Sequence, residues 1–91
     1  MPLATENQIE EFLKGHPDWA VDDGELTTTA TMKDFVGAMG LVTRIALLAE
    51  KANHHPDIAI SWNLVTLRLS THSEGGITPK DLDLAGQLPL A

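Results

Sequence analysis

The sequence predicts an α+β domain with elements in the order α-β-β-α-β-β-α, in which a four-stranded antiparallel sheet carries three helices on one face. Three observations lead to this fold class. Helix-capping motifs begin apolar segments, short runs alternate apolar and polar side chains, and turn signals separate those runs. Because 91 residues suit one domain, we expect residues 1–91 to form a single unit.

The first and third helices are predicted from the motifs at their N-termini. Thr5-Glu-Asn-Gln8 is a capping box, in which the threonine hydroxyl accepts from the third backbone amide and the glutamine reaches back. Thr78-Pro-Lys-Asp81 is a variant with aspartate at the third position. Pro79 suits the first helical position because no N–H is needed there.

The middle helix, expected over residues 32–52 after the similar motif Thr31-Met-Lys-Asp34, is apolar on two sides. One stripe contains Phe35, Met39, Val42, Ala46 and Ala49. A second stripe contains Ala38, Leu41, Ile45, Leu48 and Ala52. A surface helix needs only one apolar stripe, so we expect another copy of the chain to cover part of this helix.

Four strands fill the remaining segments. A short strand around residues 19–21 pairs with residues 25–31 across the turn signal Asp22-Asp23-Gly24. Residues 58–62 and 65–69 alternate apolar and polar side chains and read as a tight hairpin around Asn63. We expect Trp19 and Trp62 to belong to the core, as tryptophans usually do.

Composition limits the functions that the chain can have. It carries 13 acidic and 6 basic residues, a formal charge of -7, which disfavours direct binding to nucleic acid or anionic membranes. It contains no cysteine, which removes disulfides and zinc-thiolate sites. The first residues do not read as a secretory signal, and no apolar run approaches the ~20 residues of a membrane span. We therefore expect a cytoplasmic protein that gains stability by oligomerisation.

The predicted fold places three of the four histidines. Asn53 can adopt the left-handed conformation that ends helices, and Pro56 prevents the helix from resuming. His54 and His55 then occupy the corner between helix and strand. His72 follows the fourth strand, and antiparallel pairing of the last two strands brings the start of one beside the end of the other. We therefore expect His72 to approach His54 and His55.

Converging imidazoles suit proton transfer at neutral pH. Glu50, one helical turn before His54, and Asp81 are candidates to orient or charge-tune them. A metal site is the competing chemical interpretation, but adjacent histidines chelate one ion poorly because their side chains diverge. The residues also allow a simpler interpretation. The His-His-Pro corner can be turn chemistry, Asp81 a helix cap and Glu50 a solvated charge, while His16 is expected to be an ordinary loop residue.

Several further motifs accompany the histidines. They are Asn53-His54-His55-Pro56-Asp57, Trp62-Asn63, Ser70-Thr71-His72, Gly76 and Asp81, with Lys33-Asp34-Phe35, Thr43-Arg44 and Ala49-Glu50-Lys51 upstream. Together these motifs resemble the pterin-4a-carbinolamine dehydratase family. The resemblance extends from about residue 19 to residue 88. It implies an antiparallel sheet with three helices on one face, and association as dimers or tetramers.

The resemblance also implies an activity, the dehydration of 4a-hydroxytetrahydrobiopterin to quinonoid dihydrobiopterin without a cofactor or metal. The family's pattern assigns catalysis to His54, His55 and His72. It assigns contacts with the pterin to Asn53, His54, His55, Ser70, Thr71, His72 and Ser73. Which histidine acts as acid and which as base stays open.

The sequence departs from the family's pattern at two places. Ile58 and Ala59 stand where a tryptophan and another bulky residue are usual, which bears on substrate preference. Ile60 and Ser61 stand where Asn-Val is common, which bears on the mode of association. A non-catalytic binding or assembly protein, or a dimerisation cofactor of a transcription factor, is the alternative, and retention of all three histidines favours catalysis.

Overall fold

The computed structural model describes residues 2–91 and has the predicted order of elements. The helices are α1 (Glu6–Gly15), α2 (Phe35–Ala52) and α3 (Pro79–Gln87), and a short 3-10 helix, η1 (His72–Glu74), precedes α3. The strands are β1 (Ala20–Asp22), β2 (Glu25–Thr31), β3 (Asp57–Ser61) and β4 (Leu64–Leu69). The predicted α+β fold is confirmed.

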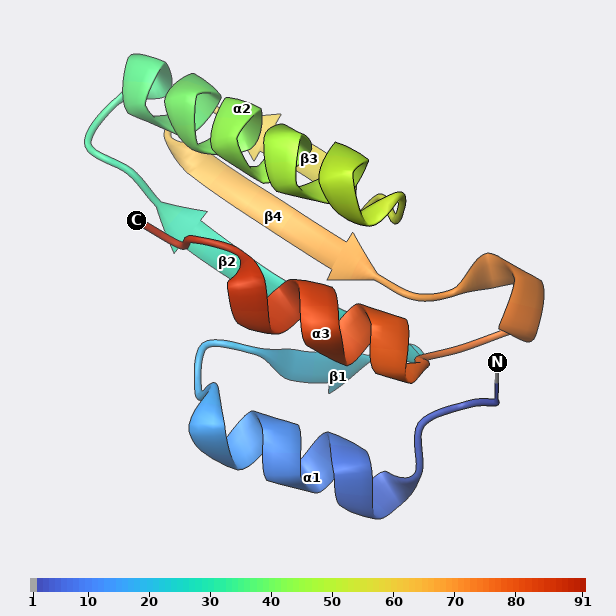
Figure 1. Cartoon of the computed structure of the whole chain (residues 1–91). Helices are drawn as coiled ribbons and strands as arrows, with labels where there is room; N and C mark the ends of the chain where they lie inside the picture. Colours follow the sequence, from blue (N-terminus) through green and yellow to red (C-terminus); the bar gives the residue numbers. More distant parts are fainter. Residues whose placement is uncertain (1) are drawn as a thin grey trace.

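The four strands form one antiparallel sheet in the order β1-β2-β4-β3. Figure 1 shows the three helices in front of this sheet, with α2 over β3 and β4 and α1 beside β1. The pairing of β2 with β4 sets Leu26 opposite Leu69, so the start of β2 lies beside the end of β4. This central pairing, between segments far apart in the chain, brings the β1–β2 turn to the same end of the sheet as His72.

The core lies between the sheet and the helices. Fully buried large side chains include Leu26, Leu41, Ile45, Leu67, Leu69 and Leu84. Burying each such side chain contributes about 1.5–3 kcal/mol. Of the two apolar stripes of α2, the one containing Ala38, Leu41 and Ile45 is buried here. Within residues 2–91, no helix has both the length and the apolar character required to cross a bilayer.

Local motifs behave as predicted at several points. Gln8 and Thr5 form the capping box of α1, and Pro79 occupies the first turn of α3. Asp23 and Gly24 connect β1 to β2 with φ of 51° and 76°, the positive values that a two-residue type I′ turn requires.

The predicted start of the middle helix is wrong. Thr31 is the last residue of β2, and α2 begins only at Phe35, with the carboxylate of Asp34 accepting from the N–H of Gly37 at 2.7 Å. The reason is a long-range contact: the N–H of Met32 donates to the carbonyl of Asn63 at 2.8 Å. This bond continues the strand pairing by one residue and delays the helix.

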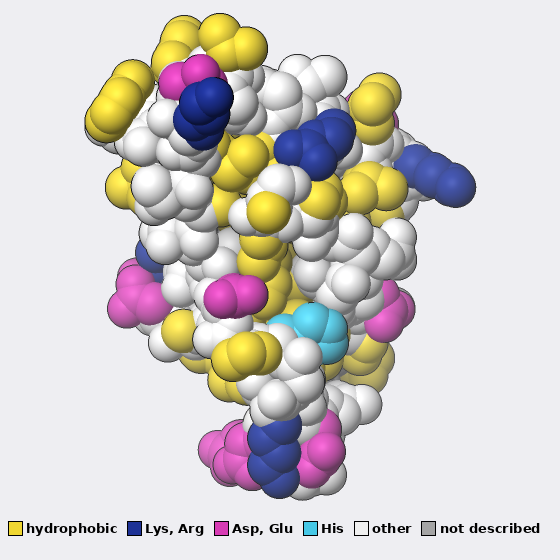
Figure 2. Space-filling model, turned by 90° about the vertical axis from the view of Figure 1, so that its left-hand side faces the viewer, with side chains coloured by type: hydrophobic (Ala, Val, Ile, Leu, Met, Phe, Trp, Pro, Cys, Tyr) yellow, Lys and Arg dark blue, Asp and Glu magenta, His cyan; other side chains and the backbone are white. Residues whose placement is uncertain are grey.

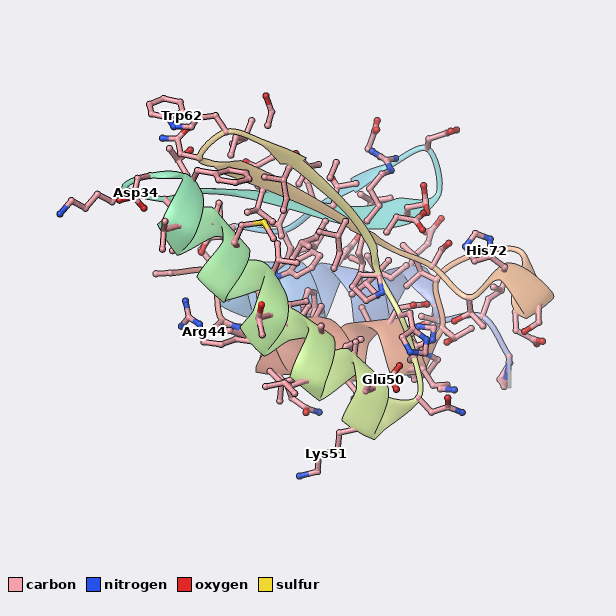
Figure 3. All side chains as sticks on the ribbon, turned by 90° about the horizontal axis from the view of Figure 1, so that it is seen from above. Asp34, Arg44, Glu50, Lys51, Trp62 and His72 are labelled. Atoms are coloured by element: carbon pink, nitrogen blue, oxygen red, sulfur yellow. The ribbon has the colours of Figure 1, made fainter. Side chains whose placement is uncertain are left out.

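The prediction that both tryptophans belong to the core is correct for Trp19 and wrong for Trp62. Trp62 sits in the two-residue turn between β3 and β4 with φ of 51°, and it is 67 % exposed. A side chain at the tip of a hairpin projects beyond the sheet, so no core is available to it. Figure 3 shows Trp62 beside Asp34, at the opposite end of the molecule from His72.

Candidate active site

The corner between α2 and β3 is built by Asn53. Its φ of 50° and ψ of 42° are left-handed, and its N–H donates to the carbonyls of Ala49 and Glu50. The prediction that Asn53 ends the helix is confirmed. Because the chain turns at this point, His54 and His55 leave α2 in succession and bond to different carboxylates.

His54 is held inside the molecule by an aspartate of α3. Its side chain is only 12 % exposed, and its Nε2 donates to Oδ1 of Asp81 at 2.5 Å. Asp81 is fully buried, and its second oxygen accepts from the backbone N–H of Thr78 and the hydroxyl of Thr71, each at 2.8 Å. Asp81 thus caps α3 and contacts His54 at the same time. These donors are what allow a carboxyl group to be buried at acceptable cost.

His55 lies at the surface and pairs with α2. Its Nε2 donates to Oε1 of Glu50 at 2.6 Å, and both side chains are exposed. An exposed pair of this kind contributes about 0–1 kcal/mol to stability. The pair therefore orients the imidazole of His55 more than it stabilises the fold.

His72 begins η1 and lines a cavity of about 340 Å³. This volume falls within the range of about 300–1,000 Å³ that is usual for small-molecule sites. The cavity is lined by Asp23, Gly24, Glu25, Asp57, Ser70, His72, Gly75 and Gly76. Sequence reasoning identified only His72 and Ser70 as site residues among these. Asp23 and Glu25 escaped it because the order of the strands, which brings the β1–β2 turn to β4, cannot be read from local patterns. Asp57 was noted only as the last residue of the motif that begins at Asn53, and it was assigned no role.

Glu25 is the most firmly held of these carboxylates. Its Oε1 accepts from Nε of Arg68 at 2.9 Å, and its Oε2 accepts from the hydroxyl of Ser70 at 3.1 Å. The hydrogen bond from Arg68 is the main cause that lowers the pKa of Glu25 below its ordinary value. In turn, Glu25 and then Asp22 raise the pKa of the Arg68 guanidinium. The hydroxyl of Ser70 is thus directed at Glu25 along the cavity wall.

The other predicted site residues lie around the same end of the sheet. His54 borders a separate cavity of about 160 Å³, together with Lys80, Asp83 and Gln87. Within residues 2–91, no hydrogen bond joins the imidazoles of His54, His55 and His72 to one another. The link that the structure provides instead runs from His54 through Asp81 to Thr71, the residue before His72.

Asn53 and Ser73 are exposed, the latter within η1. No group of three or more histidine, cysteine, aspartate or glutamate side chains suited to a metal ion occurs in the described part of the chain. His16, the fourth histidine, stacks on Phe12 and donates from Nδ1 to its carbonyl at 2.8 Å. It ends α1 rather than standing in an open loop.

Comparison with known proteins places the chain in a family. The family model described as pterin 4 alpha carbinolamine dehydratase matches residues 2–89. A relative in Nocardia farcinica named for that enzyme is 46 % identical over 86 residues, covering 94 % of this chain and 90 % of its own. A relative of the same name in Thermosynechococcus vestitus is 51 % identical over 77 residues, covering 85 % and 81 %.

The chain belongs to the pterin-4a-carbinolamine dehydratase family. A crystal structure of a transcriptional coactivator/pterin dehydratase from Brucella melitensis superposes with a TM-score of 0.88 and 35 % identity, covering 94 % of each chain. The resemblance to the family is therefore confirmed over almost the full sequence. With it, the prediction of a hydro-lyase of the dehydratase class is confirmed at the level of the family.

Proposed function

We propose that this member of the dehydratase family converts 4a-hydroxytetrahydrobiopterin to quinonoid dihydrobiopterin and water, and so returns an oxidised pterin to use. The single observation that carries the proposal is the arrangement of side chains at one end of the sheet, where β4 ends. There, His72 lines a cavity of ligand size and is joined through Thr71 to the buried pair of His54 and Asp81. Family membership supplies the class of reaction.

The reaction needs two proton transfers and no change of oxidation state. A general acid gives a proton to the hydroxyl on carbon 4a, the C–O bond breaks, and water leaves. A general base takes the proton from the adjacent ring nitrogen as the carbon–nitrogen double bond forms. Each transfer by a positioned imidazole accelerates a reaction by roughly 10²–10⁴-fold. We propose His54, His55 and His72 as the groups that carry these protons.

The remaining site residues hold the ring and the imidazoles in this proposal. Backbone and side-chain groups of Asn53, Ser70, His72 and Ser73 contact the pterin. The sequence also assigned Thr71 to this contact, but its hydroxyl donates its proton to Asp81. Asp81 and Glu50 support the histidines to which they are bonded, at 2.5 Å and 2.6 Å. Hydrogen bonds from a second residue fix which ring nitrogen carries the proton, and this is what a proton-transfer site requires.

Stopped-flow absorbance of 4a-hydroxytetrahydropterin decay tests the proposal. Wild-type protein should accelerate the decay, and a His54→Ala/His72→Ala double variant should lose at least about 100-fold of that acceleration. His16→Gln is the matched control, since His16 stacks on Phe12 at the end of α1. A well-folded wild type that leaves the decay unchanged would refute the dehydratase and turn attention to a binding or assembly role.

We also propose that the protein acts as a homo-oligomer, a dimer or a tetramer. Support comes from α2, where Phe35, Val36, Met39 and Leu47 are exposed, Val36 to 78 %. Figure 2 shows hydrophobic side chains gathered at the top of this side of the molecule, where α2 begins in Figure 1. Soluble chains seldom leave so many large apolar side chains of one helix in water.

The edge of the sheet nearest α2 supports the same proposal. Among residues 2–91, β3 pairs only with β4, so its outer edge presents unpaired backbone groups there, and most of its residues are exposed. Edge strands without proline or lysine readily pair with another chain. Sedimentation at micromolar concentration tests the proposal, and a mass of one chain would contradict it.

A further inference from the structure

We propose that Thr71 is a positioning residue that ties His54 and His72 to the same buried carboxylate. The inference rests on the proposed function for its kinetic consequence, whereas its structural part can be tested without activity. It assigns to Thr71 a task other than contact with the pterin.

The hydroxyl proton of Thr71 is already used. Its Oγ1 lies 2.8 Å from Oδ2 of Asp81 and 2.8 Å from Oγ1 of Thr78. A carboxylate only accepts, so Thr71 must donate its single proton to Asp81, and the hydroxyl of Thr78 must then donate to Thr71. No proton of this side chain remains for a substrate.

The backbone of Thr71 closes the loop that carries His72. Its N–H donates to the carbonyl of Gly76 at 2.8 Å, and its own carbonyl accepts from the N–H groups of Glu74 and Gly75, each at 3.0 Å. His72 is the next residue and the first of η1. The position of Thr71 therefore sets where the turn begins and from which point His72 reaches into the cavity.

The side chain of Thr71 meets His54 at Asp81. Oδ2 takes the hydroxyl of Thr71 and the N–H of Thr78, which leaves Oδ1 for Nε2 of His54. Because the carboxylate accepts, Nε2 carries the proton, and in the neutral ring the free lone pair is on Nδ1. Thr71 thus helps to fix one imidazole through its hydroxyl and the other through its backbone.

Thr71→Val removes the hydroxyl at nearly constant shape, Thr71→Ser keeps it, and Thr29→Val makes the same change at an exposed position of β2. Ring ¹⁵N shifts of histidine report the tautomer. We expect wild type to show His54 protonated at Nε2. The resonances of both His54 and His72 should move in Thr71→Val, return in Thr71→Ser, and stay unchanged in Thr29→Val. Unchanged resonances in Thr71→Val, or movement of only one imidazole, would overturn the proposal.

Kinetics separate positioning from substrate contact. For Thr71→Val we expect kcat to fall roughly 10-fold, as when an outer partner that orients a histidine is removed, with KM within about twofold of wild type. Thr71→Ser should recover most of kcat. A higher KM at unchanged kcat would overturn the positioning role in favour of contact with the pterin. If wild type proves inactive, the proposed function fails, while the NMR comparison still decides the role of Thr71.

Discussion

The two ends of the β3–β4 hairpin differ in the surroundings of their side chains. At the end that meets α3, polar groups are buried and bonded to one another, with Asp81 accepting from His54, Thr71 and Thr78. At the turn, apolar side chains lie in water instead, among them Trp62 at 67 % exposure. We call the exposed residues Phe35, Val36, Met39 and Trp62 the tip patch.

The difference separates the end whose polar groups one chain satisfies by itself from the end whose apolar side chains one chain leaves in water. Within residues 2–91, no buried side-chain nitrogen or oxygen lacks a hydrogen-bond partner, so the polar end is finished inside the monomer. The apolar side chains of the tip patch stay exposed to water. Hydrogen bonds between Asn63 and Met32 hold the turn to the segment before α2 but do not bury these side chains. The polar end therefore agrees with the proposed proton transfers, and the tip patch agrees with the proposed association.

Removal of the buried carboxylate should have the largest effect. Asp81→Ala leaves the N–H of Thr78, the hydroxyl of Thr71 and Nε2 of His54 without their acceptor, and we expect a loss of about 3 kcal/mol in the free energy of unfolding. Urea denaturation measures it. Asp83→Ala, an exposed aspartate on the same helix, should change stability by less than about 0.5 kcal/mol. Equal effects of the two changes would show that the buried network contributes little.

A charge within the tip patch should disrupt association. Val36 is 78 % exposed in the monomer, so Val36→Glu should barely alter the unfolding of one chain. If the patch is an interface, it should raise the dissociation constant of the oligomer by about 100-fold. Sedimentation equilibrium measures the constant. Val21→Glu places the same charge on β1, at the other edge of the sheet, and should leave the constant unchanged.

Relief of the backbone strain at the β3–β4 turn should have a smaller effect than the two changes above, and it should raise stability. Trp62 holds a left-handed φ of 51°, which costs a bulky residue about 1 kcal/mol and costs glycine little. In the Val36→Glu background, where the patch faces water, Trp62→Gly should raise the free energy of unfolding by about 1 kcal/mol. Trp62→Ala keeps the strain and should bring no such gain. A loss of stability on Trp62→Gly would mean that the indole contributes to the packing of the monomer.

The smallest effect concerns the carboxylate wall of the cavity. The hydrogen bond from Arg68 lowers the pKa of Glu25 in the folded protein. The ionised Glu25 therefore stabilises the fold at pH values above its ordinary pKa of 4.5. This contribution is lost as the pH falls from there through the lower, folded pKa. Glu25→Gln should therefore reduce the loss of stability between neutral pH and about pH 3 by roughly 0.5 kcal/mol. Urea unfolding at the two pH values measures this, with exposed Glu10→Gln as control. An unchanged pH dependence in Glu25→Gln would contradict it.

Prediction from sequence succeeded where neighbours along the chain decide the structure. The caps at Thr5 and Thr78, the helix end at Asn53 and the turn at Asp23 and Gly24 depend on hydrogen bonds or φ values within a few residues. The same motif logic failed at Thr31, because a bond from Met32 to the distant Asn63 outweighed a local cap.

The sequence by itself determined the class of fold, the family and the positions of the histidines along the chain. Only the tertiary structure decided that Asp81 bonds to His54, that Thr71 shares the same carboxylate, and that Glu25 borders the cavity of His72. Each of these relations depends on the pairing of β2 with β4 and the docking of α3, which bring together residues that are remote in sequence. Local patterns specify which elements form, whereas the close packing of the whole chain specifies which side chains meet.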